Sequence, residues 1–144
     1  MVEVQSMSTA PSTRKTAGLH HLGLTVSDLA AARDFFTRAL GFSLVFEDPA
    51  YPAAFVSDDK ITLTLWQAEP DARPFDRRAQ VGLHHAAFLI ESQSRLEGVF
   101  ETVSTWPGVE VECVLSPPRP NSPARHFLIR MPGGPRIEFF ANAG

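Results

Sequence analysis

A tetrapeptide that occurs twice is the feature that most constrains the fold of this chain. Residues 18–21 and 82–85 both read Gly-Leu-His-His, and each copy opens an apolar run. Recurrence of so specific a motif indicates two copies of one supersecondary unit, each beginning with a histidine-bearing strand. Each unit also ends on an apolar strand, and the last one carries Glu138. Two histidines and one carboxylate on paired scaffolds are therefore the first hypothesis for a functional site.

Length, composition and charge limit the classes of protein. The 144 residues, 44% hydrophobic and 20% charged, are typical of one soluble globular domain. A net charge of −3 without a basic stripe gives no support for binding nucleic acid or an acidic membrane. The single cysteine, Cys113, excludes an intrachain disulfide and is expected to be a packed thiol. No apolar run approaches the roughly 20 residues that span a bilayer, and the N-terminus lacks a secretory signal, so we expect a cytoplasmic protein.

Alternation in the first predicted strand separates two faces. Within residues 18–26, His21, Gly23 and Thr25 point to one side, and the more apolar residues between them point to the other. The apolar side should pack under a helix. His21 then lies on the opposite face, beside small side chains that leave space around its imidazole.

The rest of the first unit is predicted in the order α-β-β-β. Apolar residues recur at helical spacing over 28–40, with Ser27 as the expected N-cap and Gly41 ending the helix. Three short strands follow, at about 43–47, 53–57 and 61–67. In the last of them Thr64 and Trp66 share one face, and the apolar residues between them share the other.

The second unit repeats this order after a polar, proline-rich linker over 69–82. A strand over 83–91 places His85 in the position that His21 has in the first unit. A helix capped by Ser92 comes next. Three further strands complete the unit, at about 109–115, 125–130 and 136–141.

Domain boundaries follow from these elements. Residues 1–17 are rich in serine and threonine, show no periodicity and are expected to form a disordered tail. Residues 18–144 then form one domain, with modules at 18–68 and 83–142. Inside the linker that joins the modules, the charged run 76–78 is most simply a solvated surface, although a contact with substrate stays open.

Both ends of the domain resemble the signatures of a known family. Residues 21–29 and the Leu-Gly-Phe at 40–42 resemble the opening signature of the vicinal oxygen chelate superfamily. This group includes glyoxalase I, extradiol dioxygenases, fosfomycin resistance transferases and bleomycin resistance proteins. Residues 130–139 look like its closing Asp-Pro-x-Gly-x-x-Ile-Glu signature, with Met131 in place of the usual aspartate. The resemblance implies an α+β fold in which two tandem βαβββ modules form an open, cupped β-barrel with the helices outside.

The resemblance also implies a metal site. The family's ligands come from the first and last strands of each module, which here gives His21, Thr64 (or Thr62 if the register slips), His85 and Glu138. Threonine is not a usual ligand, so Thr64 should face water or substrate. Two imidazoles and one carboxylate leave coordination positions open, as in non-haem Fe(II) sites. The expected cofactor is Fe(II), Mn(II), Zn(II) or Ni(II), and the expected substrate chelates it through adjacent oxygens.

Three departures from the family's subgroups bear on the reaction. Thr64 stands where glyoxalase I is expected to have a carboxylate, and Leu128 stands where extradiol dioxygenases usually have a catalytic tyrosine. Gly23 replaces a threonine that fosfomycin transferases tend to carry. We therefore expect a metal-dependent enzyme with dioxygenase- or lyase-like chemistry and leave the reaction unassigned. The alternative is a drug-binding protein of the bleomycin resistance type, which sequesters its ligand without turnover.

The same alternation predicts further residues around the substrate. His126 is a candidate acid or base, because a near-neutral imidazole can move a proton in either direction; a partly exposed strand histidine is the alternative. Leu128 shares its face. Arg130 or Arg136 could hold an anionic group through the planar guanidinium or form a surface salt bridge. Trp66 could stack on a substrate ring, or it could only form part of the wall of the cupped barrel.

A second copy of the chain is the expected macromolecular partner. Open sheet edges favour pairing between copies, and short members of the family often pair modules between chains. We therefore expect a homodimer that binds a small-molecule substrate, with no nucleic-acid or membrane partner. Whether the two modules close around the metal within one chain or across two stays open.

Overall fold

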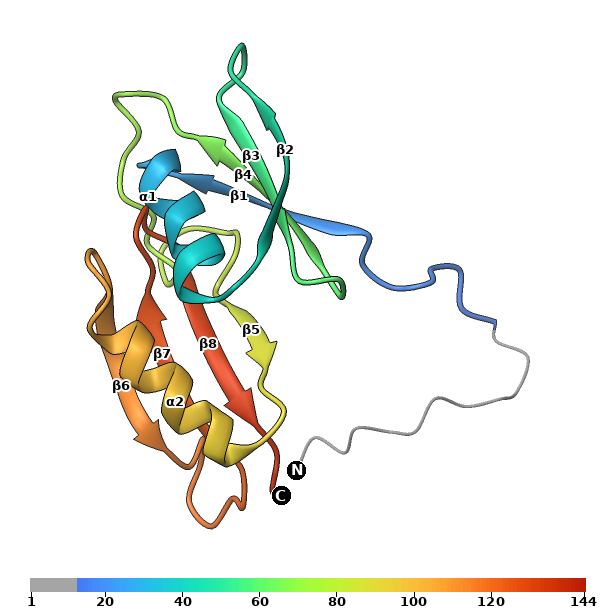
Figure 1. The fold of residues 1–144 in the computed structure, drawn as a ribbon, viewed down its shortest axis with the longest axis vertical. Helices are drawn as coiled ribbons and strands as arrows, with labels where there is room; N and C mark the ends of the chain where they lie inside the picture. Colours follow the sequence, from blue (N-terminus) through green and yellow to red (C-terminus); the bar gives the residue numbers. More distant parts are fainter. Residues whose placement is uncertain (1–12) are drawn as a thin grey trace.

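The computed structural model describes residues 13–144 and contains two modules, each with the order β-α-β-β-β that the sequence predicts (Figure 1). The elements are β1 (His21–Val26), α1 (Leu29–Asp34), the π-helical turn η1 (Phe35–Ala39), β2 (Ser43–Asp48), β3 (Ala53–Ser57), β4 (Thr62–Gln67), β5 (Ala86–Leu89), α2 (Gln93–Ser104), β6 (Glu110–Ser116), β7 (Arg125–Arg130) and β8 (Arg136–Ala141). Of the predicted N-terminal tail, residues 1–12 lie outside the described part of the chain, and 13–17 belong to no helix or strand. None of the helices in 13–144 has the length and apolar character needed to cross a membrane.

The two modules form two sheets with the same topology. The first sheet has the strand order β1-β4-β3-β2, and the second has the order β5-β8-β7-β6. In each sheet the first and last strands of the module run parallel, and the remaining neighbours run antiparallel. The sheets are separate, so the cup is not closed within this chain. β1 and β5 are each left at the edge of a sheet.

Each sheet has one face covered by the helix of its module and one face free of it, here called the helix-free face (Figure 1). In β1, Leu24 and Val26 are buried, whereas His21, Gly23 and Thr25 are exposed. This is the alternation that the sequence predicts. The candidate site residues of β1 therefore lie on the helix-free face.

The start of α1 corrects one detail of the sequence analysis. Asp28, rather than Ser27, is the N-cap, and its Oδ1 accepts a hydrogen bond from the backbone N–H of Ala31 at 3.0 Å. The backbone N–H of Ser27 instead donates to the carbonyl of Gly133 at 2.9 Å. Ser27 is thus held by the turn between β7 and β8, which belongs to the other module. Gly41 ends the helical segment with φ +75°, as expected.

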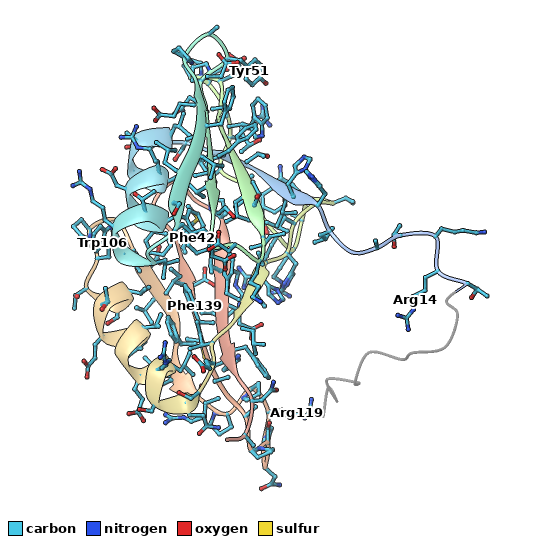
Figure 2. The ribbon with its side chains drawn as sticks, turned by 45° about the vertical axis from the view of Figure 1, so that its right-hand side comes forward. Arg14, Phe42, Tyr51, Trp106, Arg119 and Phe139 are labelled. Atoms are coloured by element: carbon cyan, nitrogen blue, oxygen red, sulfur yellow. The ribbon has the colours of Figure 1, made fainter. Side chains whose placement is uncertain are left out.

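Aromatic rings join the modules into one core. Phe88 of β5 lies 6.2 Å from Phe36 of η1 and 5.9 Å from Phe42, between ring centroids. Phe139 of β8 stacks on Phe88 at 6.1 Å from the other side. Figure 2 shows Phe42 and Phe139 in the interior, where the upper module meets the lower one. This packing fixes the modules side by side and leaves both helix-free faces available.

Candidate functional site

The helix-free face of the second sheet carries polar side chains at the predicted positions. In β8, Glu138 alternates with Ile137 and Phe139, which are fully buried under α2. In β7, Leu128 is paired directly with Glu138, and His126 lies two residues away on the same face. Leu128 is buried, so it forms part of the floor of this face.

The carboxylate of Glu138 lies between two imidazoles. Its Oε2 is 2.6 Å from Nδ1 of His126, and its Oε1 is 3.4 Å from Nε2 of His85. The first distance is that of a strong hydrogen bond, in which the ring N–H donates to the carboxylate. The side chains of His126 and Glu138 are 11% and 15% exposed, and that of His85 is 35% exposed. Solvent therefore reaches the carboxylate from the side of His85.

The two histidines of each repeated tetrapeptide bind one another. Nδ1 of His20 is 2.9 Å from Nδ1 of His21, and Nδ1 of His84 is 2.7 Å from Nδ1 of His85. One nitrogen of each pair donates and the other accepts, which leaves Nε2 of His21 and of His85 for another ligand. The sequence analysis extended both strands too far. In the structure the two strands begin at His21 and at Ala86. His20 and His84 therefore lie before the strands, and their side chains do not follow the two-face alternation of strand residues.

The surroundings of His84 favour the neutral form of its imidazole. Desolvation lowers the pKa of His84, and electrostatic interactions with His85, Arg136 and Arg77 lower it further. A neutral imidazole has one donor and one acceptor nitrogen. His84 can therefore act as the hydrogen-bond partner that holds the ring of His85.

The carboxylate of Glu112 interacts with three arginines, which are Arg77, Arg130 and Arg136. Nε of Arg136 is 2.6 Å from Oε2 of Glu112, and Nη2 of Arg130 is 3.8 Å from Oε1. Burial alone would raise the pKa of Glu112. The hydrogen bond from Arg136 and the positive charges of all three arginines outweigh burial, so this pKa lies below its ordinary value.

A β-bulge brings two successive residues of β6 to the same face. The register between β6 and β7 shifts between Val111 and Cys113. Glu112 consequently reaches Arg136, while Sγ of Cys113 lies 3.9 Å from Nε2 of His126. Strict alternation would have put these neighbours on opposite faces. Cys113 is therefore only half-buried, rather than a packed thiol.

His21 lies on the first sheet, apart from the other two predicted metal ligands. It is the first residue of β1, paired with Thr62 of β4, and it is exposed. Its ring contacts His20. In the described part of the chain, no three His, Cys, Asp or Glu side chains are grouped so that they could hold a metal ion. One chain thus brings His85 and Glu138 together and does not add His21.

A row of aromatic rings lines the helix-free face of the first sheet. Nε1 of Trp66 donates to Oγ1 of Thr64 at 2.9 Å. The indole lies 5.1 Å from the ring of Tyr51 and 5.7 Å from that of Phe55, and Phe46 continues the row. Tyr51 lies at the upper tip of the molecule in Figure 2. Thr64 is only 4% exposed, so its hydroxyl accepts the hydrogen bond from Trp66 and is not open to solvent.

Gly23 makes room for this arrangement. A Cβ atom at position 23 would lie 3.2 Å from Oγ1 of Thr64 and 3.6 Å from Nε1 of Trp66. The space that the sequence analysis assigned to His21 is therefore taken by the indole and the threonine hydroxyl.

Sequence reasoning missed Arg77 and Glu112. Arg77 was assigned to a solvated linker, but its Nε is buried and has no hydrogen-bond partner. The clustered charges at 76–78, separated by three residues from the second Gly-Leu-His-His, are the signal that could have found it. Glu112 reaches the site through a bulge, which leaves no periodic signal in the sequence.

Comparison with known proteins agrees with this architecture. Residues 18–139 match the model of the Glyoxalase/Bleomycin resistance protein/Dioxygenase superfamily. The chain belongs to this superfamily. The match spans both modules, including His21, His85 and Glu138. The family resemblance inferred from the sequence is therefore confirmed.

Comparison with individual members of the superfamily supports the fold of this chain but does not establish its reaction. An uncharacterised protein of Bacillus subtilis, YqjT, is 34% identical over 91 residues, which cover 60% of this chain and 69% of that protein. Lactoylglutathione lyase of Agrobacterium tumefaciens superposes with a TM-score of 0.65 at 20% identity, over 89% of this chain and 96% of that one. The fosfomycin resistance protein FosX of Listeria monocytogenes gives 0.68 at 18% identity, over 88% and 94%. Similarity at this level establishes the two-module architecture.

Proposed function

We propose that this chain is a metal-dependent enzyme that acts on a small molecule through adjacent oxygen atoms, with dioxygenase- or lyase-like chemistry. The observation that carries the proposal is the Glu138 carboxylate held between His126 and His85. The donor set fits a divalent Fe, Mn, Zn or Ni ion, since imidazole nitrogen and carboxylate oxygen are suitable ligands. Nε2 of His85 and Oε1 of Glu138 would hold the ion from the second sheet, and His21 would supply the third ligand.

The neighbouring side chains would position these ligands. His126 donates to Oε2 of Glu138 and so orients the carboxylate with Oε1 toward His85. His84 engages Nδ1 of His85 and leaves Nε2 for a ligand. Metal-binding histidines and carboxylates usually have such partners behind them. When bound, the metal would supply Lewis acidity or a place for oxygen beside the substrate.

The third ligand is proposed to come from a second copy of the chain. His21 begins β1, and His85 directly precedes β5. Both strands are sheet edges with unpaired backbone groups, which favour pairing with another chain. If β1 of one copy lies beside β5 of its partner, the two histidines come to the same edge. A two-fold axis would produce two such sites in a dimer.

A binding protein without turnover is the second candidate function. The row formed by Phe46, Phe55, Trp66 and Tyr51 favours it, because exposed aromatic rings can stack on a planar ligand. Phe46 and Tyr51 are 51% and 62% exposed. Under this function, the first sheet alone would bind an aromatic drug, and His85 and Glu138 would not be required.

Metal content separates the two functions. Protein purified without chelator and loaded with Fe(II), Mn(II), Zn(II) or Ni(II) should contain close to one ion per chain. His85→Ala and Glu138→Gln should lose the ion, whereas Glu101→Gln, an exposed acid on α2, should keep it. A wild type that stays metal-free after loading, yet binds a planar aromatic drug, would support sequestration and refute the enzyme.

A further inference from the structure

An excess of positive charge lies beside the proposed metal ligands. Arg130 and Arg136 both pair with Glu112, and the charge of Arg77 also lowers the pKa of this carboxyl group. In the described part of the chain, Glu112 is the only acid that forms an ion pair with these arginines. Glu138 is turned toward its two imidazoles. The single negative charge of Glu112 therefore faces the positive charges of three guanidinium groups.

Arg77 has a donor that no protein group satisfies. Its Nε is buried and lacks a hydrogen-bond partner within residues 13–144. A buried donor of this kind costs free energy and is rare in folded proteins, particularly on a charged group. The residue belongs to the linker before Gly-Leu-His-His, and its charge acts on Glu112 of β6, so the linker brings a cation close to the second sheet.

These arginines are close enough to the proposed metal ligands for one small molecule to reach both. Arg136 precedes Glu138 by two residues on the same face of β8, a spacing of about 7 Å along a strand. The charge of Arg77 also acts on Glu112, which pairs with Arg136. Arg136 therefore lies next to Glu138 on β8, and Arg77 of the linker acts on the same partner carboxylate as Arg136.

We propose that Arg77 and Arg136 form a subsite for an oxyanion group of the substrate, either a carboxylate or a phosphonate. The proposal rests on the proposed function, because the subsite lies two residues along β8 from Glu138, a proposed metal ligand. Guanidinium groups suit such ligands, since their fork of N–H donors matches paired oxyanion oxygens. The oxyanion is held by the guanidinium groups of Arg77 and Arg136 and balances the charge that Glu112 leaves uncompensated. The substrate is thus an anionic small molecule.

Calorimetric titration with phenylphosphonate, benzoate and uncharged benzamide tests this subsite. The full-length protein is titrated at constant ionic strength, with and without EDTA. We expect at least one of the two anions to bind in EDTA more tightly than benzamide, and the tighter anion identifies the preferred group. Arg77→Ala should weaken its binding about ten- to a hundred-fold, the range for a hydrogen bond to a charged group.

Arg78→Ala is the matched control, because it removes the same charge from the next residue of the linker, where the side chain is exposed. It should leave anion affinity unchanged. Equal binding of benzamide, or equal losses in Arg77→Ala and Arg78→Ala, would overturn the subsite. Anion binding that requires the metal would also overturn it. The proposed function is tested separately, by metal content. If the protein takes up no metal but still binds the anion, the proposed function is refuted and the subsite is supported.

Discussion

At the scale of single residues, His126 differs in role from the other histidines. It is the most deeply buried imidazole of the site, and both of its ring nitrogens face protein groups, Glu138 and Cys113. A ring so enclosed is suited to orienting a carboxylate. The sequence analysis proposed acid–base catalysis for His126, which stays a prediction; the hydrogen bond to Glu138 favours a positioning role.

Replacing His126 should weaken the metal site without removing a ligand. We expect His126→Ala to lower metal affinity by about 10- to 100-fold, the usual effect of losing a partner behind a ligand. Cys113→Ala alters the contact on the other side of the ring and should leave affinity unchanged. Competition with a fluorescent chelator measures both, and thermal unfolding shows whether each variant is folded. Equal affinity in His126→Ala and wild type would refute the positioning role.

The ion pair of Glu112 should make stability depend on pH. Because the pKa of Glu112 is lowered in the folded protein, its contribution is fully present above the ordinary glutamate value of about 4.3 and is lost as pH falls through the lowered value. Urea unfolding of wild type and Glu112→Gln should therefore differ at pH 6 and converge in acid. A difference that persists unchanged at about pH 3 would contradict this account.

At the scale of secondary-structure elements, periodicity predicts most of the structure. The predicted strands at 53–57, 125–130 and 136–141 have the observed limits, and the alternation of β8 places Glu138 on the correct face. Two features have no periodic signal. The bulge in β6 turns Glu112 and Cys113 to one face, and the late start of β5 frees His84 from the strand. Both depend on contacts between strands rather than on the local sequence.

The turn between β7 and β8 should be sensitive to side-chain size. Gly133 has φ +94°, and a Cβ atom there would lie 3.0 Å from Cβ of Val26 and 3.5 Å from that of Ala32. Gly134 has φ +114° but open space around it. Both alanine variants carry backbone strain of about 1–3 kcal/mol. We expect Gly133→Ala to cost about 1–3 kcal/mol more, because only it crowds the other module. Urea denaturation measures the difference, and equal losses would contradict the crowding.

At the scale of the whole molecule, the sequence predicts two modules but leaves their pairing open. The signatures near His21 and Glu138 identify each module, and they are the same whether the cup closes within a chain or between chains. Pairing depends on how Phe36, Phe42 and Phe88 pack the modules together, which is a property of the assembled core. In this arrangement the two sheets are separate, and β1 and β5 keep free edges. Gel filtration should give a dimer-sized peak, and a monomer-sized peak would refute the proposed pairing.

Mixing two inactive variants tests directly whether the site is shared. His21→Ala and Glu138→Ala should each fail to bind metal alone. In a mixed dimer, one of the two sites combines the intact His21 of one copy with the intact His85 and Glu138 of the other. With random pairing, co-refolded protein should recover about one quarter of the wild-type metal sites. Mixing His85→Ala with Glu138→Ala should recover none, because these two ligands come from the same copy. A site formed within one chain would give no recovery in either mixture.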